Sequence, residues 1–119
     1  MDTFSAIAEP TRRAILEMLA RKGPLSATQI YESFDATHPA ISQHLKVLRE
    51  ANLVVVEKRG QQRIYRINTQ AMLEVEDWAK RIADRWNQRF DALEQVLAAE
   101  KKKLEAENQK EQENGTPEP

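Results

Sequence analysis

The first 52 residues carry apolar side chains at helical spacing, in short segments that turn signals separate. Pro10 and Pro39 suit the first turn of a helix, because the N–H that proline lacks would be unpaired there anyway. Gly23 and Pro24 are typical of a helix end, and Asn52 suits the left-handed residue that often follows one. The pattern therefore predicts helices over residues 3–8, 10–21, 27–34 and 37–51.

A period of two follows residue 52 and then gives way to one long helical segment. Residues 53–59 and 63–67 are rich in β-branched side chains and flank Gly60-Gln61-Gln62, so they predict a β-hairpin with a basic, polar tip. Residues 70–108 contain no Gly or Pro and predict a single helix. Residues 109–119 have no large apolar side chain to bury, and we expect them to be a disordered tail.

The fourth predicted helix has two chemically distinct faces when it is projected at 100° per residue. One face is apolar and includes Ile41, Leu45 and Leu48, with His44 among them. The opposite face carries polar side chains that can reach base edges and basic side chains that can reach phosphates. The first are His38, Ser42 and Gln43, and the second are Lys46 and Arg49, with Pro39 and Glu50 on the same face. An ordinary amphipathic helix with a solvated face gives a similar projection. The short turn before this helix, however, also makes it the second helix of a candidate helix-turn-helix, the position that reads DNA.

The hairpin makes the DNA interpretation more specific. A basic hairpin directly after a helix-turn-helix forms a winged helix, whose wing lies along the backbone or minor groove of the same duplex. The expected fold class is therefore mostly α with a small β-hairpin: a winged helix-turn-helix domain over residues 1–69, followed by a long C-terminal dimerisation helix over 70–108. The candidate DNA contacts come from helix 37–51 and wing 54–67, and they are Thr37, His38, Pro39, Ser42, Gln43, Lys46, Lys58, Arg59, Gln61, Gln62 and Arg63.

Two stretches of the sequence carry a family resemblance. They are AIAEPTRRAILEMLARKGPLSATQIYESF and THPAISQHLKVLREANLVVVEKRGQQRIYRI. Along residues 4–68 the chain resembles the ArsR-type winged-helix repressors of bacteria. The resemblance implies a homodimeric repressor that binds a palindromic operator. It also implies that Pro39, Ser42 and Gln43 match the family's DNA-reading positions, with His38 and Lys46 beside them.

The chain departs from that family pattern at two places. Glu9 precedes Pro10 where family members often have Asp, which caps a helix better. The final helix also runs well past the usual end. It carries an apolar stripe at helical spacing, formed by Val75, Trp78, Ile82, Trp86, Phe90, Leu93, Leu97 and Leu104. The helix could fold back over its own domain, but we favour a partner subunit, because bulky aromatic residues are enriched at interfaces. The candidate dimer contacts are Phe4, Val75, Trp78, Ile82, Trp86 and Phe90.

Charge and composition exclude several other classes of protein. The formal net charge of the chain is -1, but residues 1–69 carry ten bases and seven acids, which favours an anionic partner for this part. The apolar runs are far too short to span a membrane, and the N-terminus has no features of an export signal, so we expect a cytoplasmic protein. No acid–base or nucleophilic pair converges in the pattern, which argues against an enzyme.

Metal sensing, which occurs in many ArsR-type repressors, lacks its usual ligands here. The chain has no cysteine, and its two histidines, His38 and His44, both lie in the predicted reading helix. His44 projects onto the core face, where a hydrogen-bonded, buried histidine is commoner than a metal ligand. We therefore expect no metal site and no cofactor. The main alternative to a DNA-binding function is the same fold used as a protein-interaction module, which the basic side chains of the fourth helix and the wing argue against.

Overall fold

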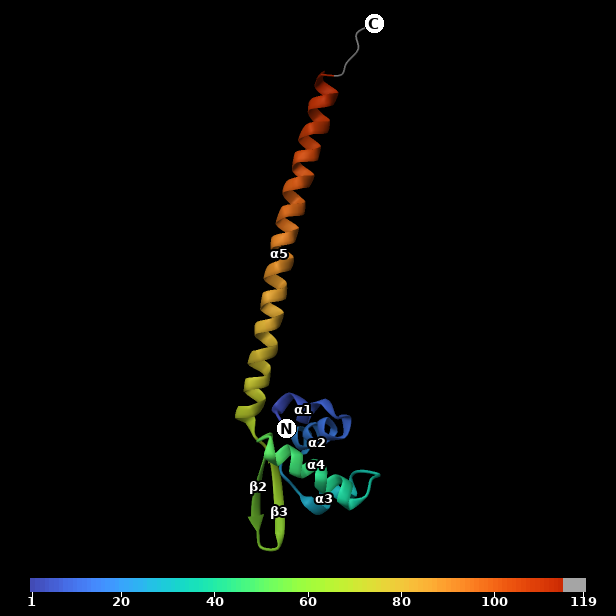
Figure 1. The fold of residues 1–119 in the computed structure, drawn as a ribbon, viewed down its shortest axis with the longest axis vertical. Helices are drawn as coiled ribbons and strands as arrows, with labels where there is room; N and C mark the ends of the chain where they lie inside the picture. Colours follow the sequence, from blue (N-terminus) through green and yellow to red (C-terminus); the bar gives the residue numbers. More distant parts are fainter. Residues whose placement is uncertain (115–119) are drawn as a thin grey trace. The chain divides into compact units, whose positions relative to one another are not determined.

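The structure is a computed structural model that describes residues 1–114. It divides into two compact units, Met1–Glu76 and a second that begins at Asp77, and each is described by itself. In chain order the elements are α1 (Thr3–Ala8), α2 (Pro10–Lys22), β1 (Leu25–Ser26), α3 (Ala27–Glu32), α4 (His38–Glu50), β2 (Val54–Arg59), β3 (Gln62–Ile67) and α5 (Thr69–Asn114) (Figure 1). The predicted fold class, mostly α with a small β element and a long C-terminal helix, is confirmed.

Side chains satisfy the helix ends of the first unit. Glu9 does cap α2, because its carboxylate accepts a hydrogen bond of 3.0 Å from the backbone N–H of Arg12. Partial burial alone would raise the pKa of Glu9, but that hydrogen bond and the nearby charge of His44 outweigh burial and lower it. The guanidinium groups of Arg12 and Arg13 donate to the last carbonyls of α1, so both ends of the tight α1–α2 junction are paired.

In the helix-turn-helix, a capping residue fixes the start of each of the two helices. Ser26 and Gln29 form a reciprocal capping box at the start of α3. The hydroxyl of Thr37 accepts from the backbone N–H of Ala40 at 3.3 Å and begins α4. Asn52 has a φ of 61°, which confirms the left-handed residue predicted after this helix.

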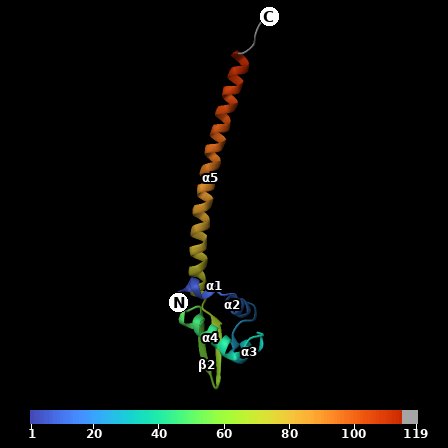
Figure 2. The same ribbon diagram turned by 45° about the vertical axis from the view of Figure 1, so that its right-hand side comes forward.

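The sheet has a third strand that the sequence pattern did not predict. Its order is β1-β3-β2, with both pairs antiparallel. In β1, Leu25 pairs with Tyr65 of β3, and Ser26 pairs with Ile64. A strand of two residues has no periodicity of its own, so only its pairing with a distant strand defines it. Strands β2 and β3 extend beyond α3 and α4 as the wing (Figure 2).

One core holds the first unit together. Its fully buried large side chains come from α2, α3, α4 and the residue just before β2, and they are Ile15, Ile30, Ile41, Leu45, Leu48 and Leu53. Ala71 of α5 is also buried in this core, and Met72 packs against it. The first unit therefore extends to Glu76, seven residues past the boundary expected at residue 69.

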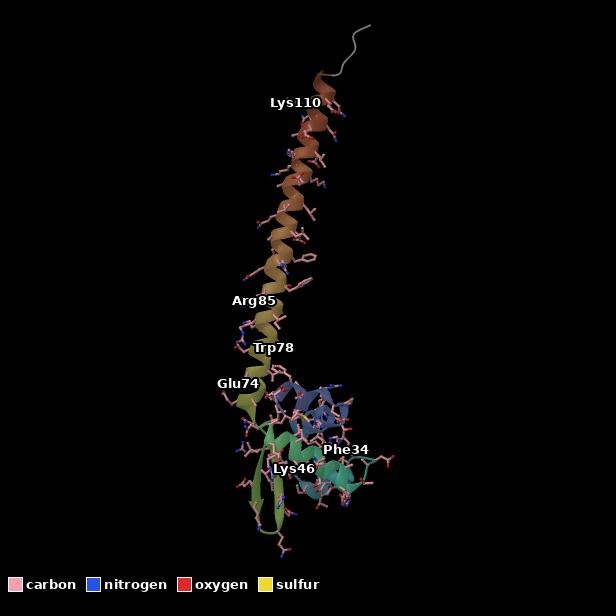
Figure 3. The ribbon with its side chains drawn as sticks, viewed as in Figure 1. Phe34, Lys46, Glu74, Trp78, Arg85 and Lys110 are labelled. Atoms are coloured by element: carbon pink, nitrogen blue, oxygen red, sulfur yellow. The ribbon has the colours of Figure 1, made fainter. Side chains whose placement is uncertain are left out.

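Two helix boundaries differ from the prediction by more than one residue. The third helix ends at Glu32, and Phe34, expected to be helical, packs against the core from the turn that follows (Figure 3). Residues 109–114, expected to be disordered, continue α5 to Asn114. Most of these are good helix formers, and extending an existing helix costs little. The rest of the expected tail, residues 115–119, lies outside the described residues.

Candidate nucleic-acid interface

Helix α4 presents the two faces that its sequence pattern predicts. Ile41, Leu45 and Leu48 are buried in the core. The opposite face is exposed over two full turns and more, at His38, Pro39, Ser42, Gln43, Lys46 and Arg49. Lys46 lies in the middle of this face (Figure 3). Near the N-terminus of the helix the exposed side chains are short and polar. Toward its C-terminus Lys46 and Arg49 are basic, and the last residue, Glu50, is acidic.

The N-terminal turn of α4 is anchored by two contacts. Thr37 is exposed, and its hydroxyl is engaged in the helix cap. The ring of His38 stacks on the ring of Tyr31 from α3, with centroids 4.7 Å apart and an angle of 17° between the planes. The stack holds the His38 ring against the first helix of the helix-turn-helix, so His38 is positioned before any ligand arrives.

His44 lies on the inner side of α4 but is less buried than predicted. Its side chain is 22% exposed. Its Nδ1 lies 3.3 Å from the Arg12 guanidinium and 3.8 Å from the Glu9 carboxylate. Because Arg12 also holds the end of α1, these contacts connect α4 to the α1–α2 junction. His44 therefore helps to fix the position of α4 against that junction.

The wing places its polar side chains on an exposed tip. Lys58 pairs across the hairpin with Arg63, and Arg59 pairs with Gln62, so basic and amide groups flank the turn on both strands. All of the predicted wing residues are exposed, Gln61 included. Arg59 makes an ion pair of 3.2 Å with Glu57, and both of these side chains are largely exposed. Such a pair contributes little energy and leaves Arg59 able to exchange partners.

Side chains of α4 and the wing come together where these two elements meet. Ser42, Lys46 and Arg63 line a small polar cavity together with Arg49 and Tyr65. Arg49 was expected on the polar face of α4, within reach of phosphates, because it follows Ser42 by seven residues. Tyr65 was not among the candidate DNA contacts, although strand alternation places it on the same face of β3 as Arg63.

Comparison with known proteins places this geometry in a family. A helix-turn-helix domain model matches residues 7–57. Over 77 residues the chain is 36% identical to the transcriptional repressor SdpR of Bacillus subtilis strain 168, a match that covers 65% of this chain and 84% of SdpR. The chain is also 31% identical to an ArsR family transcriptional regulator of known crystal structure, of which it covers 86%. The chain belongs to the ArsR family of winged-helix transcriptional regulators.

Solved structures of ArsR-type regulators agree with this assignment. The crystal structure of that ArsR family transcriptional regulator matches with a TM-score of 0.64, and the match covers 71% of this chain. An ArsR-like transcriptional regulator from Rhodococcus sp. RHA1 matches with a TM-score of 0.68 and 29% identity, covering 78% and 87%. The ArsR-family chain described here is thus a DNA-binding transcriptional regulator, as its sequence pattern predicts.

The distal part of α5 in this ArsR-family chain carries a second exposed surface, the apolar stripe. Its side chains are exposed by 43% at Trp78 and by 63% at Trp86. The other large members, Ile82, Phe90, Leu93, Leu97 and Leu104, lie within that range, as does the neighbouring Val96. Of the other candidate dimer contacts, Phe4 is exposed on α1, whereas Val75 is half-buried.

Residues 1–114 lack the features of two other kinds of site. Among them, no three His, Asp or Glu side chains come close enough together to hold a metal ion. In the same part of the chain, no helix combines the length and apolarity needed to cross a membrane.

Proposed function

We propose that this ArsR-family regulator is a homodimeric repressor that binds a palindromic operator, with α4 in the major groove and the wing along the backbone. The observation that carries the proposal is the exposed face of α4, which is polar at its N-terminal end and basic toward the wing. That order matches what DNA requires: short polar groups meet base edges, and cations meet phosphates.

Ser42 and Gln43 are the proposed base readers. Both are exposed near the start of α4, where a recognition helix enters the groove. Glutamine can pair with the adjacent acceptor and donor of adenine, and serine can pair with several bases. Pro39 and His38 flank them, and the stack on Tyr31 holds the His38 ring in place at this end.

The wing and the end of α4 are the proposed backbone contacts. Lys46 lies on the exposed face of α4, and Thr37 stands at its N-terminal cap. The wing supplies the exposed side chains Lys58, Arg59, Gln61, Gln62 and Arg63. These groups fix the orientation of the protein on DNA and carry little sequence information.

Because the chromosome of a bacterium or archaeon lies in the cytoplasm, we place the protein there. We propose no catalytic role for it.

The apolar stripe of α5 is the proposed dimer contact. A contiguous apolar surface of this kind is costly to leave in water. Its members recur at helical spacing along one side, which suits packing against another helix. A second copy of the chain offers the same stripe, and two copies would present two α4 helices to two half-sites of an operator. Phe4 of α1 and Val75 of α5 are proposed to lie at the edge of that contact.

Selection of bound fragments from genomic DNA tests the proposal. The full-length protein is incubated with sheared genomic DNA, and the retained fragments are sequenced. We expect an enriched motif with two inverted half-sites about one helical turn apart. A protein-interaction module would retain no motif. A direct repeat or a single half-site would contradict the symmetric dimer.

A further inference from the structure

A small polar cavity lies between α4 and β3. Its volume is about 160 Å³, and it is lined by Ser42, Lys46, Arg49, Arg63 and Tyr65. A water molecule occupies about 30 Å³ in the liquid, and pockets for drug-sized ligands usually measure about 300–1,000 Å³. The cavity therefore suits a compact group larger than water and smaller than a typical metabolite.

The helix and the strand bring their side chains to this cavity in register. Ser42, Lys46 and Arg49 follow one another at i, i+4 and i+7, which places them in a row along one side of α4. Arg63 and Tyr65 are two residues apart in β3 and so share one face of the sheet. Tyr65 is buried in the core, so this is the face that packs on the helices. The three side chains of α4 and the two side chains of β3 therefore meet at the cavity.

The cavity gathers positive charge. Lys46, Arg49 and Arg63 line it, and none of the lining residues is acidic. Within the part of the chain that the structure describes, none of these three side chains makes an ion pair or hydrogen bond, unlike Arg59, which pairs with Glu57. Like charges held near one another repel, and an anion between them removes that repulsion.

We propose that this cavity is a seat for one phosphate group, and that its occupant in the complex is a phosphate of the DNA backbone. The identification of the occupant as a DNA phosphate rests on the function proposed above. Arginine guanidinium groups match phosphate oxygens with paired N–H donors, and the hydroxyls of Ser42 and Tyr65 can donate as well. One phosphate would then be gripped by α4 and the wing together, which makes Arg49 and Tyr65 positioning residues for the reading helix.

A shared phosphate predicts a specific energetic signature in DNA binding. We expect Arg49→Gln and Arg63→Gln each to weaken binding to a mixed-sequence duplex about tenfold, as loss of a hydrogen bond to a charged group does. The double variant should lose clearly less than the product of the two losses, because residues with a common partner are coupled. Tyr65→Phe, which keeps the ring, should weaken binding in the same direction by less.

Arg21→Gln is the matched control. Arg21 lies in the last turn of α2, as Arg49 lies in the last turn of α4, and both are exposed. Removing its charge should change the affinity by less than about twofold. If Arg49→Gln behaves like Arg21→Gln, or if the losses at Arg49 and Arg63 multiply, the shared DNA phosphate is contradicted.

A second arm uses inorganic phosphate and identifies the source of the group. Sodium phosphate replaces sodium chloride at constant ionic strength, and the amide signals of residues 42–49 are followed by NMR. A saturable shift in the wild type that Arg49→Gln abolishes supports the seat without DNA. If this shift appears while the DNA losses multiply, the group comes from solution.

The two arms also separate this inference from the proposed function. A wild-type protein that binds no duplex but shows the phosphate shift would refute the operator function and keep the seat. If DNA binds but neither the coupling nor the shift is observed, the seat is wrong and the proposed function stands.

Discussion

The winged domain and the distal part of α5 both contain amphipathic helices, yet the apolar side chains are buried in the first and exposed in the second. In α4, Leu45 and Leu48 are buried against neighbouring elements of the same chain. In α5, the stripe from Trp78 to Leu104 is largely exposed. The same periodicity therefore leads to two kinds of surface. A stripe within a set of short helices and turns finds its partner in its own chain. The stripe on one uninterrupted helix stays exposed, which supports the proposed contact with a second copy.

Core truncation should produce the largest effect on stability and the clearest contrast between the regions. Leu48→Ala is expected to lower the free energy of unfolding by about 2–5 kcal/mol, because it leaves a cavity among fully buried side chains. The loss should be the same at low and high protein concentration, since every contact is within one chain. Leu97→Ala removes the same atoms from an exposed position, so its effect should depend on concentration. Urea unfolding at two concentrations measures both, and a concentration-dependent Leu48 effect would contradict the comparison.

Charge placed in the stripe should break the dimer without unfolding the winged domain. The wild type is expected to be a dimer at micromolar concentration, and Ile82→Glu or Trp86→Glu to be a monomer, because an unpaired charge in an apolar contact is costly to desolvate. Gln88→Glu adds the same charge on the opposite side of α5 and should leave the dimer intact. Analytical ultracentrifugation decides, and a monomeric wild type would refute the proposed role of the stripe.

The Glu9 cap should give a smaller, pH-dependent effect confined to the winged domain. Folding lowers the pKa of Glu9 from its ordinary value of 4.5, so the carboxylate stabilises the fold above that pH. The stabilisation is lost as the pH falls through the lowered pKa. Glu9→Gln should therefore reduce stability by about 0.3–1 kcal/mol near neutral pH, as for a charge at a helix N-terminus. Urea titrations at successive pH values measure this difference, which should vanish in acid; a difference that grows in acid would contradict the cap.

Metal ions should give the smallest effect of all. A metal site near the reading helix or on the terminal helix would need cysteines, or a set of histidine and carboxylate ligands. The chain has no cysteine. Zinc, cadmium or arsenite at tens of micromolar should change operator affinity by no more than a few-fold, whereas a tenfold change needs about 1.4 kcal/mol of coupling. Fluorescence titration with labelled operator tests this. A hundredfold loss that a chelator reverses would reveal a site in one of the two regions.

Local patterns made α4 and its surroundings predictable. The buried and exposed positions of α4 follow from a period of 3.6, and Asn52 from the geometry of helix ends. What escaped prediction depends on contacts between distant residues. Strand β1 exists only through its pairing with Tyr65 and Ile64, and Phe34 leaves the helix because the core accepts its ring from a turn. The meeting of Arg49 with Arg63 and Tyr65 is of the same kind, since the packing of α4 on the sheet determines it.

The central claim is that the reading helix recognises bases while the wing contacts the DNA backbone. One pair of titrations tests it directly. Gln43→Ala and Arg59→Ala are each titrated with the selected operator and with random DNA at several salt concentrations. Gln43→Ala should weaken the operator by about 1–3 kcal/mol more than random DNA and leave the salt dependence nearly unchanged. Arg59→Ala should weaken both DNAs by similar factors and reduce the slope of log affinity against log salt by about one or two units, because a dimer loses the phosphate contact twice. If Arg59→Ala alters sequence preference while Gln43→Ala does not, the wing is the reader and α4 is not.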